Sequence, residues 1–492
     1  MISGDAPRVL FVTPECAPLA QVGGLGDVSA ALPPALRAVG TDARVLMPGY
    51  RRVLASLHAL EPIARFSALE PPREAVLLEG RLPTGVPVYV LDHAPLYDRD
   101  GDPYQDVLRR DWPDNALRFA LLSHVAAQLG GADSPLAWQP HVVHLNDWPA
   151  GLAAAYLHYM PQRRAASVFT AHNLAFQGNF DAGLRSGLAL PPESYAPEGL
   201  EFYGQVSFLK AGLFFADAIT TVSPTYSREF QTEPFGAGMH GVLQKRRGVL
   251  HGILNGIDTA VWDPATDPHL PVRYSRDTLD AKRHVKRALQ QRLSLPVAPQ
   301  DVPLIGMVGR LTHQKGIDLV LEAVPHLAEM AQLALVGAGA PEHEDALCGV
   351  AARFPQRIGV VIGFDEALAH LIEGGADMFL MPSRFEPCGL NQMYSQRYGT
   401  PPIAHATGGL ADTIVDCTPA TLAAGTATGF LFTAPRVDAL QEAIARACAV
   451  YRASDAWHRL QRNGMARDFS WAGPARAYAA LYRSLVRQRA RG

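Results

Sequence analysis

Lysine is scarce in this chain of 492 residues, and basic residues do not outnumber acidic ones. The chain has 44 lysines and arginines against 47 acidic residues, and its formal net charge is -3. Lysine itself occurs at five positions: Lys210, Lys245, Lys282, Lys286 and Lys315. Nucleic-acid-binding domains usually carry a clustered basic face, so we expect no nucleic acid among the partners.

Cysteine pairs and long apolar runs are also missing. The cysteines at positions 16, 348, 388, 417 and 448 are odd in number and form no CxxC pair, which argues against a disulfide framework or a zinc site. No apolar stretch approaches the roughly 18 residues that span a bilayer. The first residues enter a strand without a signal-peptide pattern, so we expect a cytoplasmic protein with no membrane partner.

One acidic loop, residues 98–102 (DRDGD), looks at first like a calcium site. The sixth position of a calcium loop would be Pro103 and the twelfth Arg109, where glycine and glutamate are needed. We interpret the loop as a solvated turn, and we expect no metal site in the chain.

The residues that are present alternate between apolar strands and helical patterns. Such alternation, in a chain with 48% hydrophobic residues, predicts an α/β fold with doubly wound parallel sheets in two domains. Strands are expected at residues 8–13, 42–48, 86–92, 141–147, 167–173, 218–224, 304–310, 331–339, 358–364, 376–382 and 401–406.

Residues 382–413 hold the most informative stretch. A buried strand ending at Pro382 would deliver Ser383, Arg384 and Glu386 to the carboxyl edge of a parallel sheet, where such sheets bind ligands. Helical patterns then begin at residues 389–390 and after residues 408–409. Two helix N-termini with unpaired N–H groups, beside a carboxylate, predict a site for a sugar joined to a diphosphate. A structural cap is the alternative interpretation of Glu386.

Other strand ends carry polar or glycine-rich segments. Residues 21–27 (QVGGLGD) connect a strand to a helix expected near Asp27, which suits phosphate binding or an ordinary turn. Asp147 and His172 follow two further strands and together favour a ligand cleft, although either alone is often structural. Arg310 and Lys315 could neutralise a leaving diphosphate or could simply be solvated.

These segments closely resemble the starch and glycogen synthases of glycosyltransferase family 5, over residues 9–482. The resemblance rests on SRFEPCGLNQMYSQRYGT with TGGLADT, on the HxxDW and HN sequences, and on RLTxQKG. It implies a GT-B fold of two Rossmann-like domains facing across a deep cleft. The implied parts are an acceptor-side domain at residues 1–257, a nucleotide-sugar domain at 258–470, and a helix at 471–492 that crosses back to the first domain.

The resemblance also implies the site residues. The catalytic set would be His172, Asp147, Arg310, Lys315 and Glu386. The donor-binding set would be Gln21, Gly23, Gly24, Asn173, Asn255, Phe364, Cys388, Gly389, Leu390, Thr407, Gly408 and Gly409. In the family an aromatic at Phe364 stacks on the nucleotide base, although a core position would suit this residue equally.

The chain departs from the family pattern at two positions. Gln21 stands where the family has lysine in its Lys-x-Gly-Gly-Leu loop, and His240 stands where an acidic residue is usual. Tyr394 replaces the second glutamate of the wider Glu-x7-Glu motif, which is normal for family 5.

The resemblance implies retaining transfer of glucose from ADP-glucose to the non-reducing end of an α-1,4-glucan, with no cofactor. An alternative is a catalytically weakened glucan-binding or regulatory homologue, motivated by Gln21 and His240. A phosphorylase is set aside, since none of the few lysines stands in a pyridoxal phosphate context. The sequence is silent on the oligomeric state.

Overall fold

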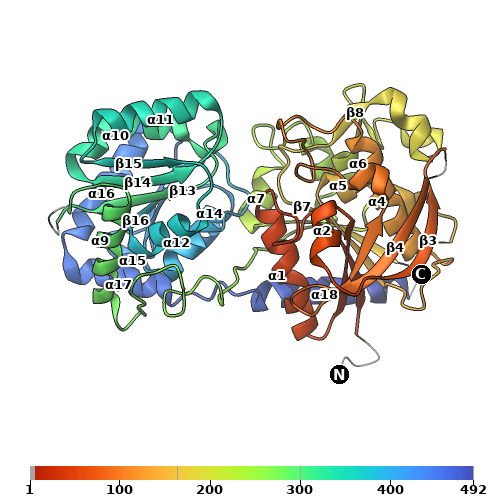
Figure 1. The fold of residues 1–492 in the computed structure, drawn as a ribbon, viewed down its shortest axis with the longest axis horizontal. Helices are drawn as coiled ribbons and strands as arrows, with labels where there is room; N and C mark the ends of the chain where they lie inside the picture. Colours follow the sequence, from red (N-terminus) through yellow and green to blue (C-terminus); the bar gives the residue numbers. More distant parts are fainter. Residues whose placement is uncertain (1–5, 72, 163–164, 298, 300, 491–492) are drawn as a thin grey trace. The chain divides into compact units, whose positions relative to one another are not determined.

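The computed structural model describes residues 6–71, 73–162, 165–297, 299 and 301–490. The chain forms two compact units, Met1–Gly256 with Trp471–Gly492 and Ile257–Ser470. Figure 1 traces the elements of each unit along the sequence. Each unit has its own sheet and its own buried core.

The first unit is built on a nine-stranded sheet in the order β12-β11-β7-β6-β1-β2-β5-β4-β3. The seven strands from β12 to β5 pair in parallel, and β3 and β4 are added antiparallel. The strand bounds are β1 Arg8–Val12, β2 Asp42–Pro48, β3 Glu61–Ala68, β4 Arg73–Arg81, β5 Pro87–Asp92, β6 Val142–Asn146, β7 Ala166–Ala171, β11 Ala218–Thr221 and β12 Leu250–Gly252.

The antiparallel pair β3 and β4 was not expected from the sequence. Both strands are half exposed, so they lack the continuous apolar runs that mark the parallel strands. A second, small antiparallel sheet has the order β8-β10-β9, with strands Asn179–Asp181, Gln205–Ser207 and Glu201–Phe202.

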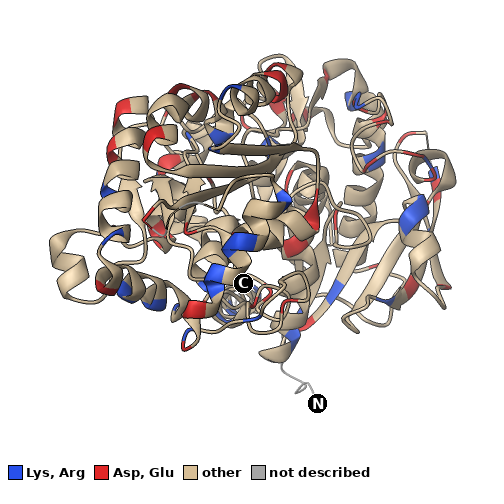
Figure 2. Ribbon diagram, turned by 60° about the vertical axis from the view of Figure 1, so that its left-hand side comes forward, with Lys and Arg blue, Asp and Glu red and all other residues tan. Residues whose placement is uncertain are grey.

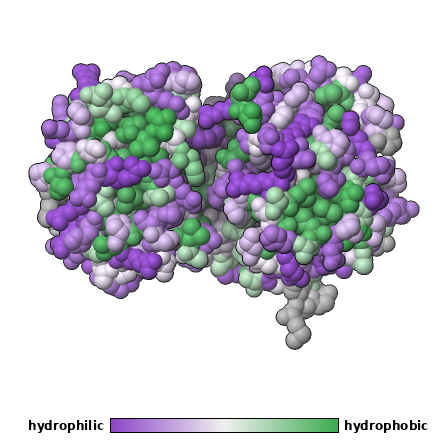
Figure 3. Space-filling view, in the orientation of Figure 1, coloured by the Kyte–Doolittle hydropathy of each residue, from purple (hydrophilic) through white to green (hydrophobic). Residues whose placement is uncertain are grey.

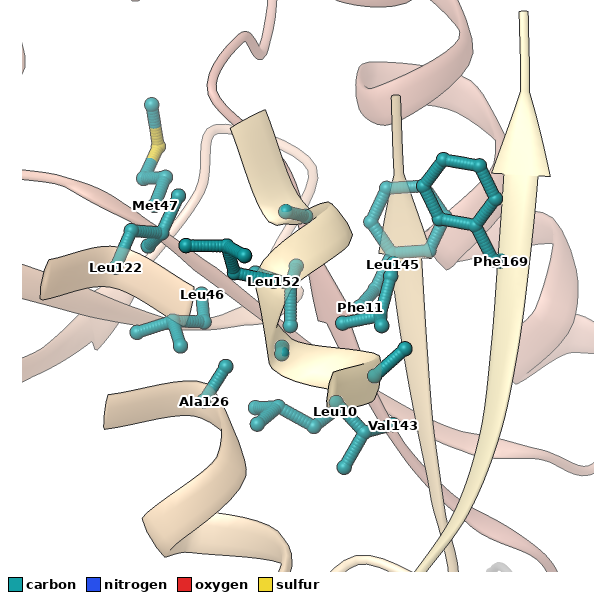
Figure 4. Close-up of a cluster of buried hydrophobic side chains, with 14 of the residues drawn as sticks. Leu10, Phe11, Leu46, Met47, Leu122, Ala126, Val143, Leu145, Leu152 and Phe169 are labelled. Atoms are coloured by element: carbon teal, nitrogen blue, oxygen red, sulfur yellow. The ribbon is translucent and has the colours of Figure 1, made fainter. Parts of the chain in front are cut away.

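Helices cover the sheet of the first unit. Their bounds are α1 Gly24–Ala38, α2 Arg51–Ser56, α3 Ala94–Tyr97, α4 Asn115–Gly130, α5 Trp148–Tyr159, α6 Phe208–Phe215, α7 Pro224–Glu229, α8 His240–Lys245 and α18 Ala472–Arg489, with 3₁₀ helices Ala182–Leu188, Pro192–Ser194 and Arg247–Val249. Figure 4 shows side chains of α4 and α5, including Leu122, Ala126 and Leu152, packed against Leu46 and Val143 of the sheet.

Helix α18 belongs to the first unit although it ends the chain. Its Tyr482 hydroxyl lies 2.7 Å from Nδ1 of His144 in β6, and both residues are fully buried. The other ring nitrogen of His144, Nε2, lies 2.6 Å from the hydroxyl of Thr170 in β7. Burial lowers the pKa of His144 to about 3, so the ring is neutral and serves packing and hydrogen bonding.

The second unit has a six-stranded parallel sheet in the order β15-β14-β13-β16-β17-β18. The strands are β13 Leu304–Val308, β14 Gln332–Gly337, β15 Ile358–Ile362, β16 Met378–Met381, β17 Pro402–His405 and β18 Phe430–Phe432. Alternate residues of β14 enter two different buried clusters, with Leu333 and Leu335 in one and Ala334 and Val336 in the other. The sheet is therefore covered on both faces, as a doubly wound fold requires.

The helices of this unit are α9 Lys282–Arg292, α10 Ile317–Met330, α11 Pro341–Arg353, α12 Glu366–Gly375, α13 Asn391–Arg397, α14 Gly408–Thr413, α15 Pro419–Ala423, α16 Val437–Tyr451 and α17 Ser454–Met465, with 3₁₀ helices Leu279–Ala281 and His313–Lys315. In Figure 1, α10 and α11 lie along one side of the sheet and α12 along the other. The prediction of an α/β fold with two doubly wound parallel sheets is confirmed.

The surfaces of both units are mixed in character. Figure 2 shows basic and acidic residues interspersed along the ribbon, and Figure 3 shows apolar residues in patches bordered by polar ones. Among the described residues, no helix is long and apolar enough to cross a membrane.

Candidate functional site

The central contact in the second unit is an ion pair between Lys315 and Glu386. The Lys315 Nζ atom lies 2.5 Å from Oε2 of Glu386, and the Ser383 hydroxyl donates to the same oxygen at 2.9 Å. Lys315 ends the short 3₁₀ helix after β13, and Glu386 follows β16, the neighbouring strand. Glu386 is buried while Lys315 is partly exposed. Both predicted groups therefore come together at the carboxyl edge of this sheet.

Two glycines allow the backbone after β17 to pass close to the segment of Glu386. A Cβ atom on Gly408 would lie 1.9 Å from the Glu386 carbonyl oxygen, and one on Gly409 would lie 2.0 Å from that of Cys388. Gly408 also has a φ of 45°, which side-chain-bearing residues rarely adopt. The spelling TGGL is thus explained by close backbone packing.

The expectation that both helix N-termini present unpaired N–H groups is wrong for α14. The N–H of Gly409 donates to the Glu386 carbonyl, and the N–H of Leu410 donates to the Thr407 carbonyl. Thr407 and both glycines are buried. The amides here are used in packing this turn against residues 386–388, so Thr407, Gly408 and Gly409 shape the site.

The N-terminus of α13 does keep open donors. Within the part of the chain that the structure describes, the N–H groups of Gly389 and Leu390 donate to no protein acceptor. Both residues are partly exposed, and Gly389 has a φ of 69°. Two adjacent amides beside the Lys315–Glu386 pair can bind an oxyanion.

Two arginines lie near this edge of the sheet. Arg384 makes a bidentate ion pair with Asp318, with distances of 2.8 and 2.7 Å, so it supports the loop. Arg310 lies just after β13, beyond Gly309, and is exposed. Arg310 and Lys315 therefore remain the candidate cations for a diphosphate.

Phe364 and Cys388 lie in opposite environments. Phe364 follows β15 and is 91% exposed, which leaves its ring free to stack on a planar ligand and rules out the core position. Cys388 is only 5% exposed, so its thiol is buried. The buried thiol contrasts with the donor-binding role that the resemblance implies for Cys388.

In the first unit, Asp147 and His172 meet at the ends of adjacent strands β6 and β7. The N–H of His172 donates to Oδ1 of Asp147 at 2.7 Å, and the N–H of Asn173 donates to the same carboxyl. The Nε2 atom of His172 lies 3.1 Å from the Asn146 side-chain oxygen. Since that oxygen only accepts, Nε2 carries the proton and Nδ1 is left as an acceptor.

Asp147 combines a strained backbone with a perturbed carboxyl. Its φ of 56° and ψ of -177° lie in a region that essentially only glycine adopts. Burial raises the pKa of Asp147 to about 7, although the two amide donors oppose the shift. Burial also lowers the pKa of His172 to about 3. Strain and perturbed titration in one place are features of functional sites.

The glycine loop after β1 is organised by Glu15, a residue the sequence analysis did not single out. Its Oε2 accepts the N–H groups of Val22 and Gly23 at 2.7 and 3.1 Å, and its Oε1 accepts the Tyr104 hydroxyl at 2.6 Å. The Gly23 amide is therefore not available to a phosphate. This corrects the expectation that Gly23 in the loop of residues 21–27 binds the donor.

The start of α1 still offers donors to a ligand. Within the described residues, the N–H groups of Gly24 and Leu25 have no protein acceptor. Gln21 is exposed, and its side chain donates to Asp27 Oδ1 at 3.0 Å. Gln21 thus lies beside the open end of α1, tied to an acidic neighbour.

Three remaining positions are placed as follows. Asn255 is buried, and its side-chain oxygen has no hydrogen-bond partner among the described residues. His240 begins α8, and its Nδ1 atom is also buried without a partner there. Tyr394 stacks on Trp262 at 3.8 Å, so an aromatic contact stands where the wider motif has a carboxylate.

Two family models match separate parts of the chain. Residues 8–245 match the family model of the starch synthase catalytic domain, and residues 296–464 match that of glycosyl transferases group 1. The chain is 54% identical to a glycogen synthase of Nitrosomonas eutropha over 486 residues, covering 98% of this chain and 97% of the relative. It is 56% identical to one of Aromatoleum aromaticum over 476 residues, covering 96% of each. The chain belongs to the glycogen synthase family.

Solved structures agree with this family. The catalytic domain of starch synthase IV from Arabidopsis thaliana, bound to ADP and acarbose, is similar with a TM-score of 0.88 and 31% identity, covering 98% of this chain and all of that one. A sucrose-phosphate synthase from Thermosynechococcus elongatus has the same fold, with a TM-score of 0.60 at 19% identity over 98% of this chain and all of that one. The resemblance drawn from the sequence is confirmed, and the fold is the GT-B glycosyltransferase fold.

Two residues of the site gave no clear signal in the sequence. Glu15 lies in a loop spelled PECAP, where nothing marks a carboxylate that binds amides seven residues later. Asn146 falls at the end of an expected strand and was not singled out, yet it sets the tautomer of His172. Both residues act through contacts with other segments of the chain, and a local sequence pattern does not reveal such contacts.

Proposed function

We propose that this member of the glycogen synthase family transfers glucose from ADP-glucose to the non-reducing end of an α-1,4-glucan, with retention, and releases ADP. The carrying observation is the Lys315–Glu386 pair beside the free Gly389 and Leu390 amides. The Lys315 cation and the two amides can bind the negatively charged diphosphate, while the Glu386 carboxylate can accept hydrogen bonds from sugar hydroxyls. The starch synthase IV relative, solved with ADP and acarbose, supports a nucleotide donor and a glucan acceptor.

Retention by double displacement needs a carboxylate that is free to attack the anomeric carbon. Glu386 is held by Lys315 and Ser383, and Asp147 is held by two backbone amides. Neither is poised as a nucleophile. A front-face displacement through an oxocarbenium-like state fits better, with Arg310 and Lys315 stabilising the departing diphosphate and the His172 carbonyl near the anomeric carbon.

The donor-binding roles of Gln21, Gly24, Asn173, Asn255 and Phe364 belong to this proposal. The exposed ring of Phe364 would stack on the base, and the orphaned oxygen of Asn255 would gain a donor from the ligand. Gln21 would replace the family lysine by a neutral hydrogen bond.

A coupled assay for ADP release with glycogen tests the proposal. We expect turnover with ADP-glucose, and NMR of an elongated maltooligosaccharide should show the new linkage in the α configuration. UDP-glucose serves as the competing donor and should be used much more slowly. A protein that binds glycogen but releases no ADP would instead support the regulatory alternative suggested by Gln21 and His240.

A further inference from the structure

A cluster in the second unit brings together three metal-ligating side chains that the proposed reaction does not use. His269 lies in the segment before α9, and Glu366 and His370 lie on α12. One ligand atom from each residue lies within 4.8 Å of the other two. The rings of His269 and His370 are 4.6 Å apart between centroids.

A single buried carboxylate holds the backbone of His269 and the ring of His370. Asp267 Oδ1 accepts the backbone N–H of His269 at 2.8 Å, and its Oδ2 lies 2.8 Å from Nδ1 of His370. The Tyr398 hydroxyl donates to the same Oδ2 at 2.5 Å.

This arrangement fixes the tautomer of His370. The Asp267 side chain faces Nδ1 of His370 and accepts its proton, which leaves Nε2 with a free lone pair. Within the described part of the chain, every hydrogen bond of the His370 ring is made through Nδ1. A carboxylate that holds the distal nitrogen of a histidine is the usual support for a metal ligand.

Glu366 supplies an anionic oxygen on the same helix face. It lies one turn before His370, and residues four apart on a helix are neighbours. Glu366 is exposed and has no ion-pair partner among the described residues. The exposed His269 also lines an open surface hollow with Pro268, Leu270 and Arg292, so the cluster can be reached from solvent.

We propose that His269, Glu366 and Nε2 of His370 form a binding site for a late first-row divalent cation such as Zn²⁺. Two imidazoles and one carboxylate are a common zinc ligand set, with water in the fourth position. Zinc–ligand distances of about 2.0–2.2 Å require neighbouring ligand atoms to lie roughly 3.3–3.6 Å apart. Rotation of the two exposed side chains closes that gap, while His370 stays in place.

The bound ion would link the segment of residues 267–271 to α12, because its ligands come from both. It would also adjoin an aromatic stack, because the His370 ring lies 3.9 Å from that of Trp262, which stacks in turn on Tyr394 of α13. Trp262 is therefore a fluorescent reporter beside the site.

Equilibrium dialysis of the chelator-treated full chain against Zn²⁺ tests the proposal. We expect one tightly bound Zn²⁺ per chain and a higher Tm in its presence, because the ion binds the folded state. His269→Ala and Glu366→Gln should each weaken binding by about tenfold or more. His284→Ala, an exposed histidine on α9 outside the cluster, should bind as the wild type does.

Cobalt gives an independent signature. Co²⁺ should produce visible absorption typical of four nitrogen and oxygen ligands and should quench fluorescence that Trp262→Phe removes. Zinc binding that is unchanged in both cluster variants, or that disappears in Cys348→Ser, would overturn the proposal, as would a wild type that binds no Zn²⁺ at millimolar concentration.

Discussion

The Lys315 ammonium group and the Glu386 carboxylate lie 2.5 Å apart, although 71 positions separate them in the chain. Each therefore neutralises the charge of the other. A diphosphate would compete for Lys315, and sugar hydroxyls would compete for Glu386. The two residues should consequently respond differently to substitution.

Glu386→Gln should lower kcat by about two to three decades, or roughly 3–4 kcal/mol, with unchanged or tighter ADP binding. The amide keeps the shape but releases Lys315 to the diphosphate. Lys315→Ala should lower kcat and also weaken ADP binding. Steady-state kinetics and calorimetry measure the two effects, with Glu342→Gln, an exposed residue of α11, as the control. Equal losses of ADP affinity in both variants would contradict this division of roles.

Gly409→Ala should weaken donor binding and destabilise the second unit. The added methyl group would lie 2.0 Å from the Cys388 carbonyl, so the segment carrying Glu386 must move. Thermal unfolding and the KM for ADP-glucose report the two effects. Gly473→Ala, where a Cβ meets nothing within 4 Å, should change neither. A Gly409→Ala enzyme with wild-type KM would show that this close approach does not shape the donor site.

Gln21→Lys should raise kcat/KM for ADP-glucose several-fold at most. A charge-assisted bond exceeds a neutral one by roughly 1 kcal/mol, but a lysine here would also pair with Asp27, which now accepts from Gln21 at 3.0 Å. Adding Asp27→Asn should therefore increase the gain. If neither variant alters any kinetic constant, the loop does not contact the diphosphate.

Thiol reagents should modify Cys348 first. Cys348 is exposed, whereas Cys388 is buried, and burial raises the pKa of Cys16 to about 12 and of Cys448 to about 11. Cys348→Ser should remove the fast phase measured by mass spectrometry, and ADP-glucose should not affect that phase. Rapid labelling of Cys388 that is slowed by ADP-glucose would contradict the buried position.

His144 should make the chain less stable as the pH falls. Its pKa is about 3 in the folded state and about 6.5 when unfolded, so between these values the unfolded state binds the extra proton. The contribution of His144 to the free energy of unfolding is fully present above about pH 6.5 and decreases as the pH falls from there toward about 3. The free energy of unfolding can be measured with denaturant at several pH values between 4 and 6. His144→Asn should reduce the slope of this free energy against pH by about 1.4 kcal/mol per pH unit. An unchanged slope would mean that His144 titrates normally.

Local patterns in the sequence determined the order of the elements. Continuous apolar runs marked the parallel strands, with β2 matching its expected range of residues 42–48, because a strand covered on both faces must be apolar throughout. The half-exposed β3 and β4 lack that run and were missed. The placement of Asp147, Lys315 and Glu386 at strand ends was also visible, since parallel strands end at one edge of a sheet.

Only the tertiary structure decided which groups are engaged. Glu15 accepts a hydrogen bond from the Gly23 amide, and amides at the start of α14 donate to nearby backbone carbonyls. Asp267 is hydrogen-bonded to His370, which lies 103 positions later in the chain. No local sequence pattern predicts these contacts, because hydrogen bonds form between whichever groups the folded backbone brings within about 3 Å. The sequence by itself determined which residues reach the sheet edges, and the packing of distant segments determined which of them remain open to a ligand.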